Sequence, residues 1–290
     1  MKRFTKILFN LLACVMVLGA CLGLTACEDI KKLEITVSVY DADESAVVDK
    51  TLTVDLYRHL APETVDHIIN ECVNKGYYND AIFYKFADTQ TNPVMMGDLL
   101  YKDGAVKQND SVQVPTVKGE FKHGGTTGSN LFHKEGAVSL WRTWMAQDGS
   151  YNTSGSVKTG RGTWMMPTSS ISGYDDWFCV FAQINLEDQT NSDTWNAIKS
   201  LFTDAENYEE YVIYYTGEYD ANGSLLNNHG LTFNCVEETA FEELELEEDD
   251  YFSAEGGEFV CYNKTTVKIP FVTVNNAVQL GAKIKSVKLI

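Results

Sequence analysis

The sequence predicts a mainly β domain of the barrel or sandwich class that carries two helices. Apolar and polar residues alternate in residues 32–40 and again in residues 52–57, and a period of two is typical of half-buried strands. Further short apolar runs are separated by loops rich in Gly, Ser and Thr, and two stretches have the helical period instead. Many short strands with two isolated helices favour a closed or layered sheet.

The first three elements are a hairpin and a helix. A polar turn at residues 41–49 joins the two alternating runs, so we expect them to pair. Pro62 suits the first turn of a helix, where its missing N–H costs nothing, and Gly76 suits the C-terminal cap. Between them lies one apolar helical stripe, which consists of Val65, Ile68, Ile69, Cys72 and Val73.

The remaining elements are a second helix and several short strands. We expect Ser192 and Asp193 to cap that helix. Its buried stripe is Trp195, Ile198, Leu201 and Phe202. The strands expected after the first helix are residues 81–86, 137–141, 163–166, 177–184, 211–215, 231–236, 259–262 and 282–290.

Composition excludes several classes of function. The chain has 290 residues and a formal net charge of −18, which argues against nucleic acid as a partner because phosphate binding needs clustered Lys and Arg. The aromatic content of 12% and the 44% of apolar residues exclude a disordered chain. The five histidines lack the H-x-x-x-H spacing and the cysteines lack C-x-x-C, so no metal site is predicted.

The N-terminus predicts export and lipidation. Lys2, Arg3 and Lys6 precede an almost continuously apolar run at residues 7–24, which is the pattern of an export signal. The segment Leu24-Thr25-Ala26-Cys27 is similar to the lipobox of bacterial lipoproteins. We therefore expect residues 1–26 to be removed and Cys27 to be acylated, which would hold the protein on the extracytoplasmic face of the cell membrane. The alternative is an uncleaved anchor, since a span needs about 20 apolar residues.

Four other cysteines remain in the mature chain. Cys72 and Cys179 lie in apolar stretches and are expected to be buried small hydrophobes. Cys235 and Cys261 could form a disulfide in an exported protein, but the sequence does not fix that pairing.

Six segments, in order, resemble the cyclophilin family. They are the strand and helix start at residues 52–69 with Ala61-Pro62-Glu63-Thr64-Val65, the segment Gly76-Tyr77-Tyr78-Asn79 leading to Phe83-Tyr84-Lys85, Val94-Met95-Met96-Gly97-Asp98, Lys118-Gly119-Glu120-Phe121, Gly136-Ala137-Val138-Ser139-Leu140 and Val180-Phe181-Ala182-Gln183-Ile184. The resemblance covers residues 33–202 and the final strand.

The resemblance implies an eight-stranded antiparallel barrel with a helix at each end. The barrel would comprise residues 33–204 and 270–290, preceded by a tether at residues 27–32. Residues 205–269 would be an acidic, strand-rich insertion. Within it, residues 237–250 include nine acidic residues in fourteen, which is usual for a solvated loop.

The family's reaction is rotation about the peptide bond preceding proline, against a barrier of about 18–20 kcal/mol. It needs no nucleophile, metal or cofactor. It needs an apolar slot for the proline ring and a donor aimed at the twisted amide. The family's catalytic Arg falls on Lys85, which lacks the planar fork of a guanidinium. The resemblance further places the substrate-binding residues at Phe83, Met95, Leu140, Trp141, Trp164, Met165 and Phe178.

Two departures predict weak catalysis. The family's Gln falls on Met95, which cannot donate a hydrogen bond, and its His falls on Phe178. Arg142 is the best candidate to replace the missing guanidinium. Two functions therefore stay open for a monomeric, membrane-tethered protein: a weak isomerase that assists the folding of exported proteins, or an inactive module that binds proline-containing peptides or a surface partner.

Overall fold

The computed structural model describes residues 31–87, 93–122, 131–142, 160–203, 207–218, 232–237, 251–254 and 257–290. The predicted signal sequence, the lipidation site at Cys27 and most of the acidic run at residues 237–250 lie outside these residues. Within the described part of the chain, no helix combines the length and the apolar character needed to cross a bilayer.

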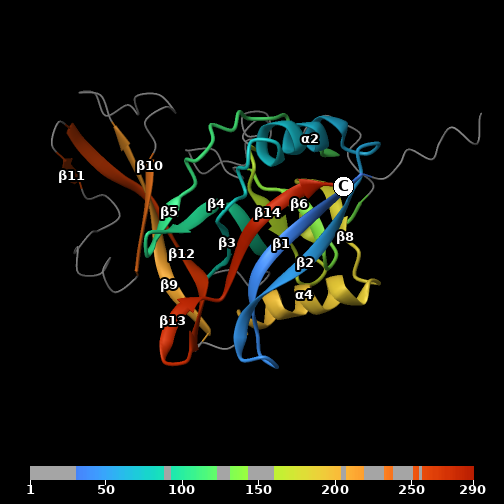
Figure 1. The fold of residues 1–290 in the computed structure, drawn as a ribbon. Helices are drawn as coiled ribbons and strands as arrows, with labels where there is room; N and C mark the ends of the chain where they lie inside the picture. The colour runs from blue at the N-terminus through green and yellow to red at the C-terminus, as the bar shows by residue number, and fades with distance from the viewer. Residues whose placement is uncertain are drawn as a thin grey trace, which may run out of the picture.

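Eight antiparallel strands close into a barrel (Figure 1). Each strand pairs with the next around the barrel, and β3 returns to β14 to complete the circle. In that order the strands are β14 (Ala282–Leu289), β1 (Lys32–Asp41), β2 (Ala46–Leu56), β8 (Cys179–Ile184), β6 (Ala137–Leu140), β7 (Trp164–Met166), β4 (Val94–Lys102) and β3 (Ala81–Phe86). The predicted fold class is confirmed.

A helix covers each end of the barrel, as Figure 1 shows. Helix α2 (Pro62–His67) begins at Pro62 as predicted and continues as the π-helical turn η1 (Ile68–Val73). At the other end lies α4 (Gln189–Ser200). The predicted cap of α4 at Ser192 and Asp193 is wrong, because the Asp188 carboxylate accepts the Asn191 backbone N–H at 3.1 Å and starts the helix earlier.

The barrel interior is one apolar core. Trp164, Trp195 and Phe181 are fully buried there, and the predicted stripes of both helices pack onto it. Cys72 and Cys179 are free, buried thiols, as predicted. Burial raises the pKa of each to about 12, so both stay uncharged and behave as small hydrophobes.

The predicted insertion is joined to the barrel wall. Its strands are β9 (Tyr208–Glu218), β10 (Thr232–Glu237), β11 (Tyr251–Ala254) and β12 (Gly257–Val274), and β13 (Ala277–Leu280) leads into β14. Strand β12 runs through the boundary that we expected after residue 269. It pairs with β3 at Lys268↔Lys85 and Val267↔Phe86. This is the same edge of β3 that pairs with β14 at Ile82.

The backbone separates the two cysteines whose pairing the sequence left open. Cys235 is on β10, opposite Ile213, and Cys261 is on β12, opposite Thr216. Strand β9 therefore lies between them. Two strand spacings amount to about 9–10 Å, which exceeds the usual Cα separation of about 4.4–6.8 Å in a disulfide.

Candidate active site

Four side chains form one row across the outer face of the barrel. Tyr84 lies opposite Met95, Met95 opposite Met165, and Met165 opposite Ser139 on successive strands β3, β4, β7 and β6. Residues directly opposite each other in a sheet project to the same face. Tyr84, Met95 and Met165 share one apolar cluster with Phe178 from the loop before β8. We call Met95, Met165 and Phe178 the slot residues.

Three other predicted substrate-binding residues lie on the opposite side of the wall. Phe83, Leu140 and Trp164 belong to the interior core and are at most 3% exposed. The reason is the alternation of side chains along a strand, since each is the immediate neighbour of a residue on the outer face. They support the outer face from within and do not line it.

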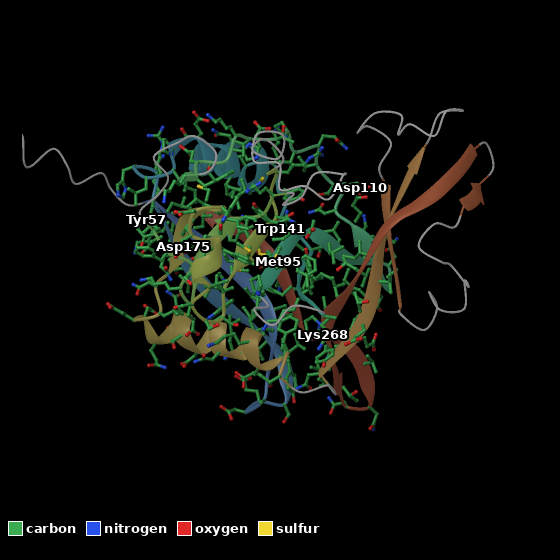
Figure 2. All side chains as sticks on the ribbon, turned by 180° about the vertical axis from the view of Figure 1, so that it is seen from behind. Tyr57, Met95, Asp110, Trp141, Asp175 and Lys268 are labelled. Atoms are coloured by element: carbon green, nitrogen blue, oxygen red, sulfur yellow. The ribbon has the colours of Figure 1, made fainter. Side chains whose placement is uncertain are left out.

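Trp141 packs against the apolar cluster that contains the slot residues. Its ring stacks on Phe178 with a centroid separation of 5.3 Å and an interplanar angle of 14°, and it lies 5.7 Å from Phe86. Figure 2 labels both Trp141 and Met95, a member of that cluster. Met95 and Met165 are 0% exposed and Phe178 is 2% exposed, so the face is filled by this chain's own side chains.

Lys85 does not lie on the same face as the slot residues. It follows Tyr84 on β3 and projects to the other face, where its Nζ lies 5.4 Å from the centroid of Phe202 at the end of α4. Burial lowers the pKa of its ammonium, and the positive charges of Lys268 and Lys199 lower it further.

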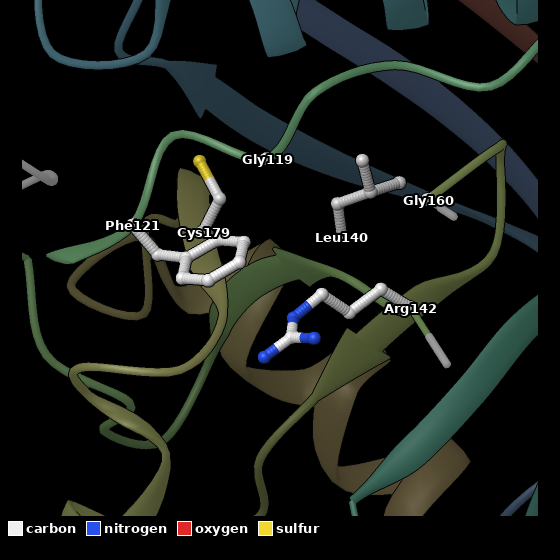
Figure 3. Close-up of a pocket in the computed structure, with 6 residues that line it drawn as sticks. All are labelled: Gly119, Phe121, Leu140, Arg142, Gly160 and Cys179. Atoms are coloured by element: carbon white, nitrogen blue, oxygen red, sulfur yellow. The ribbon is translucent and has the colours of Figure 1, made fainter. Parts of the chain in front are cut away.

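Arg142 lies beside one slot residue, Phe178, and Figure 3 shows its guanidinium next to the Phe121 ring. Its Cζ lies 4.3 Å from the ring centroid of Phe121 and 5.3 Å from that of Phe178. Its Nε donates to the Trp177 carbonyl at 2.8 Å, which fixes the plane of the guanidinium. Desolvation lowers the pKa of Arg142 to about 10, so the buried group remains a cation at neutral pH. A narrow crevice beside it is lined by Gly119, Phe121, Leu140, Gly160 and Cys179.

The comparison with known protein families shows to which family the chain belongs. The family model of the cyclophilin type peptidyl-prolyl cis-trans isomerases matches residues 43–213, more than half of the chain. The chain belongs to the cyclophilin family. No curated protein matches the sequence significantly. The family match spans all strands of the barrel wall except β1 and β14, and it reaches Ile213 in the first strand of the insertion.

This cyclophilin barrel contains a buried polar network that the sequence did not reveal. His133 Nδ1 lies 3.0 Å from Asp175 Oδ1, and His133 Nε2 lies 3.0 Å from Ser139 Oγ. The arrangement is that of a hydrolytic triad. However, Ser139 is fully buried, and its hydroxyl lies 3.0 Å from the Cys179 carbonyl oxygen as well as 3.0 Å from His133 Nε2. The network therefore holds β6 and the Asp175 loop together beneath the slot.

A second polar group supports the row from its other end. The Tyr84 hydroxyl donates to Asp98 Oδ2 at 3.0 Å. Asp98 Oδ1 is buried and has no hydrogen-bond partner among the described residues. Burial raises the pKa of Asp98 to about 6. Gly97 before it has φ +122°, and a Cβ there would lie 2.9 Å from the Gly162 carbonyl oxygen, so this position of the chain requires a glycine.

Within the described residues, no three His, Cys, Asp or Glu side chains gather into a possible metal site. The described side chains on this outer face are apolar rings, the two thioethers of Met95 and Met165, and the neighbouring Arg142 guanidinium.

Proposed function

We propose that this cyclophilin is a weak peptidyl-prolyl cis–trans isomerase, anchored through acylated Cys27 on the outer face of the cell membrane, where it acts on exported proteins. One observation carries the catalytic part of this proposal. Met95, Met165 and Phe178 come from three different segments and meet on one apolar face, in contact with a buried cation.

In this mechanism the substrate proline displaces the Trp141 ring from Phe178 and enters the face that Trp141 covers. The methionines accommodate the proline ring because a thioether side chain fills irregular space. The Arg142 guanidinium then donates to the twisted proline amide, which is the state that the enzyme must favour.

The activity is weak for two reasons. Met95 stands where the family has a glutamine and cannot donate to the substrate backbone. The loss of an aimed donor typically costs about 10²–10³ in rate. Removing Trp141 from Phe178 also costs the stacking energy of that pair, about 0.5–1.5 kcal/mol, which the substrate must offset.

The test is exchange NMR on a short Ala-Pro peptide with the full chain purified in detergent. The proposal expects cis–trans exchange to become faster with protein, and Arg142→Lys to reduce that acceleration at least tenfold. Lys85→Met serves as the matched control, because it removes a lysine of the same barrel that faces away from the slot. If Arg142→Lys changes nothing and Lys85→Met abolishes the acceleration, our assignment of the cation is wrong.

A second function is favoured by one specific observation. Lys85, at the family's catalytic position, contacts Phe202 and not the slot, which suits a module that binds proline-containing segments without turning them over. In the same titration such a module would shift the proline signals of the peptide and leave the exchange rate unchanged.

A further inference from the structure

The first turn of α2 takes its cap from a distant loop. Ala61, at the N-cap position, has no side-chain acceptor, and the first backbone N–H groups of a helix have no partner within the helix. The Glu120 carboxylate supplies both acceptors, because one oxygen accepts the Glu63 N–H at 3.2 Å and the other accepts the Thr64 N–H at 2.8 Å. Glu120 is 8% exposed, so these charge-assisted hydrogen bonds lie in a largely dry environment, where they are strong.

The helix turn that receives this carboxylate is fixed to the barrel. Thr64 is fully buried, and its hydroxyl lies 3.5 Å from the Cys179 thiol at the start of β8. The apolar stripe that follows on α2 and η1 packs into the interior core. Glu120 therefore ties its loop, across 56 positions of the chain, to a well-packed part of the molecule.

The next residue of the loop lies against Arg142. The Phe121 ring is 1% exposed, and its centroid lies 4.3 Å from Arg142 Cζ. Gly119 leaves room for this ring, because a Cβ at that position would clash with it. Figure 3 shows Gly119, the Phe121 ring and the guanidinium around one crevice. Phe121 is thus one of the groups that determine where the guanidinium lies, together with the Trp177 carbonyl.

A second anchor, on the other side of Phe121, is weaker. Lys122 Nζ lies 2.9 Å from Asp176, but the two side chains are 66% and 46% exposed. Exposed ion pairs contribute little to stability. Of these two anchors, the buried Glu120 carboxylate therefore contributes more to the position of Phe121.

We propose that Glu120 is a positioning residue for Arg142. It fixes the loop on the first turn of α2, places the Phe121 ring against the guanidinium and so sets the direction in which Arg142 donates. The inference rests on the proposed function only for the step in which Arg142 donates to the proline amide. Because a donor must be aimed at the transition state, a displaced guanidinium lowers the rate of the bound substrate more than it weakens binding.

The experiment follows the Arg142 Nε–Hε signal by NMR in the full chain, purified in detergent and labelled with ¹⁵N-arginine. The sequence has four arginines, so the signal that is missing in Arg142→Lys identifies this group. We expect Glu120→Gln, whose amide accepts through one oxygen only, to shift the signal and to make Hε exchange with water at least fivefold faster. With the Ala-Pro peptide, the same variant should lower the maximal rate at least fivefold and change KM less than twofold.

Two controls separate positioning from a loss of stability. Asp188→Ala removes the cap of α4 at the other end of the barrel. It should lower the melting temperature and leave both the Arg142 signal and the peptide rate unchanged. Lys122→Met removes the exposed anchor and should change the Hε exchange rate and the peptide rate less than twofold.

The outcomes distinguish this inference from the isomerase proposal. An unchanged Arg142 signal in folded Glu120→Gln overturns the inference, and so does an equal change in Asp188→Ala. If Glu120→Gln does not fold, Glu120→Asp, whose carboxylate is one methylene shorter, should move the signal in the same direction, and an unmoved signal there overturns the inference as well. If the natural chain does not accelerate cis–trans exchange, the isomerase proposal fails, but the Arg142 signal still decides the role of Glu120.

Discussion

His133 and Asp175 make two hydrogen bonds through one carboxylate oxygen. Asp175 Oδ1 accepts the His133 backbone N–H at 2.7 Å and faces its Nδ1 at 3.0 Å. The carboxylate therefore holds the proton on Nδ1, and Nε2 is left to face the Ser139 hydroxyl. When the His133 ring is neutral, Nε2 accepts a hydrogen bond from the Ser139 hydroxyl. When the ring is charged, Nε2 donates to the Ser139 oxygen, and the hydroxyl proton then points to the Cys179 carbonyl.

This arrangement predicts an acid-sensitive stability. Burial is the main cause that lowers the pKa of His133, and Asp175 only partly opposes it. A histidine whose folded pKa lies below its unfolded value of 6.5 contributes stability above pH 6.5, and this stability is lost as the pH falls further. Compared with His133→Gln, the natural chain should lose more of its free energy of unfolding between pH 7 and pH 5, as measured by urea denaturation. Parallel curves for the two proteins would contradict this.

The buried carboxyl of Asp98 should give stability the opposite dependence on pH. The buried carboxyl has its pKa raised to about 6, so the folded state holds a proton that the unfolded state releases above about pH 4. Its contribution to stability is therefore lost as the pH rises from about 4 to 6. The difference in melting temperature between Asp98→Asn and the natural chain should grow in favour of the variant over that range. The control is Asp103→Asn, at an exposed turn residue of the hairpin formed by β4 and β5 (Ala105–Gln108).

Trp141 predicts a gain of function. Removing its ring from Phe178 should open the outer face, because the indole stacks on Phe178 and packs against the cluster that contains Met95 and Met165. We expect Trp141→Ala to increase the acceleration of Ala-Pro exchange severalfold, with a loss of stability of about 2–4 kcal/mol. Phe132→Ala, which truncates a 67% exposed ring, should alter neither quantity. A slower exchange in a folded Trp141→Ala protein would show that the indole binds the substrate.

Cys27 predicts membrane attachment. If it carries the lipid, Cys27→Ala should abolish labelling with an alkyne fatty acid and should leave the signal sequence uncleaved, which mass spectrometry of the intact protein would detect. The isomerase rate measured in detergent should be unchanged, because Cys27 is not one of the slot residues. Labelling that persists in Cys27→Ala would place the acyl group elsewhere.

Local sequence signals predicted much of the fold. The alternation in β1 and β2 and the stripe from Val65 to Val73 are local properties, so both elements could be recognised. Strand β4 was missed as an element because six of its nine residues are buried, four of them in succession, so no alternation marks it. The closed barrel itself came from the family resemblance and not from any pattern of hydrophobicity.

The site was predicted less well, for reasons that differ by residue. Phe83, Leu140 and Trp164 were assigned to the slot although each precedes a residue on the outer face, so counting alternate positions would have placed them inside. The His133–Asp175 pair joins residues 42 positions apart, and no local signal marks it. The family motif placed Lys85 at the catalytic position, but the direction of its side chain depends on Phe202 and β12, which lie far along the chain.

The shared edge of β3 has a consequence for how this protein folds and how it could be divided. Strands β14 and β12 pair with consecutive stretches of one edge of β3. Excising the insertion would therefore leave backbone amides at the end of β3 without hydrogen-bond partners. The barrel and the strands beside it should therefore melt in one cooperative step. A chain without the insertion would lose part of the strand pairing of the barrel wall as well as the insertion itself.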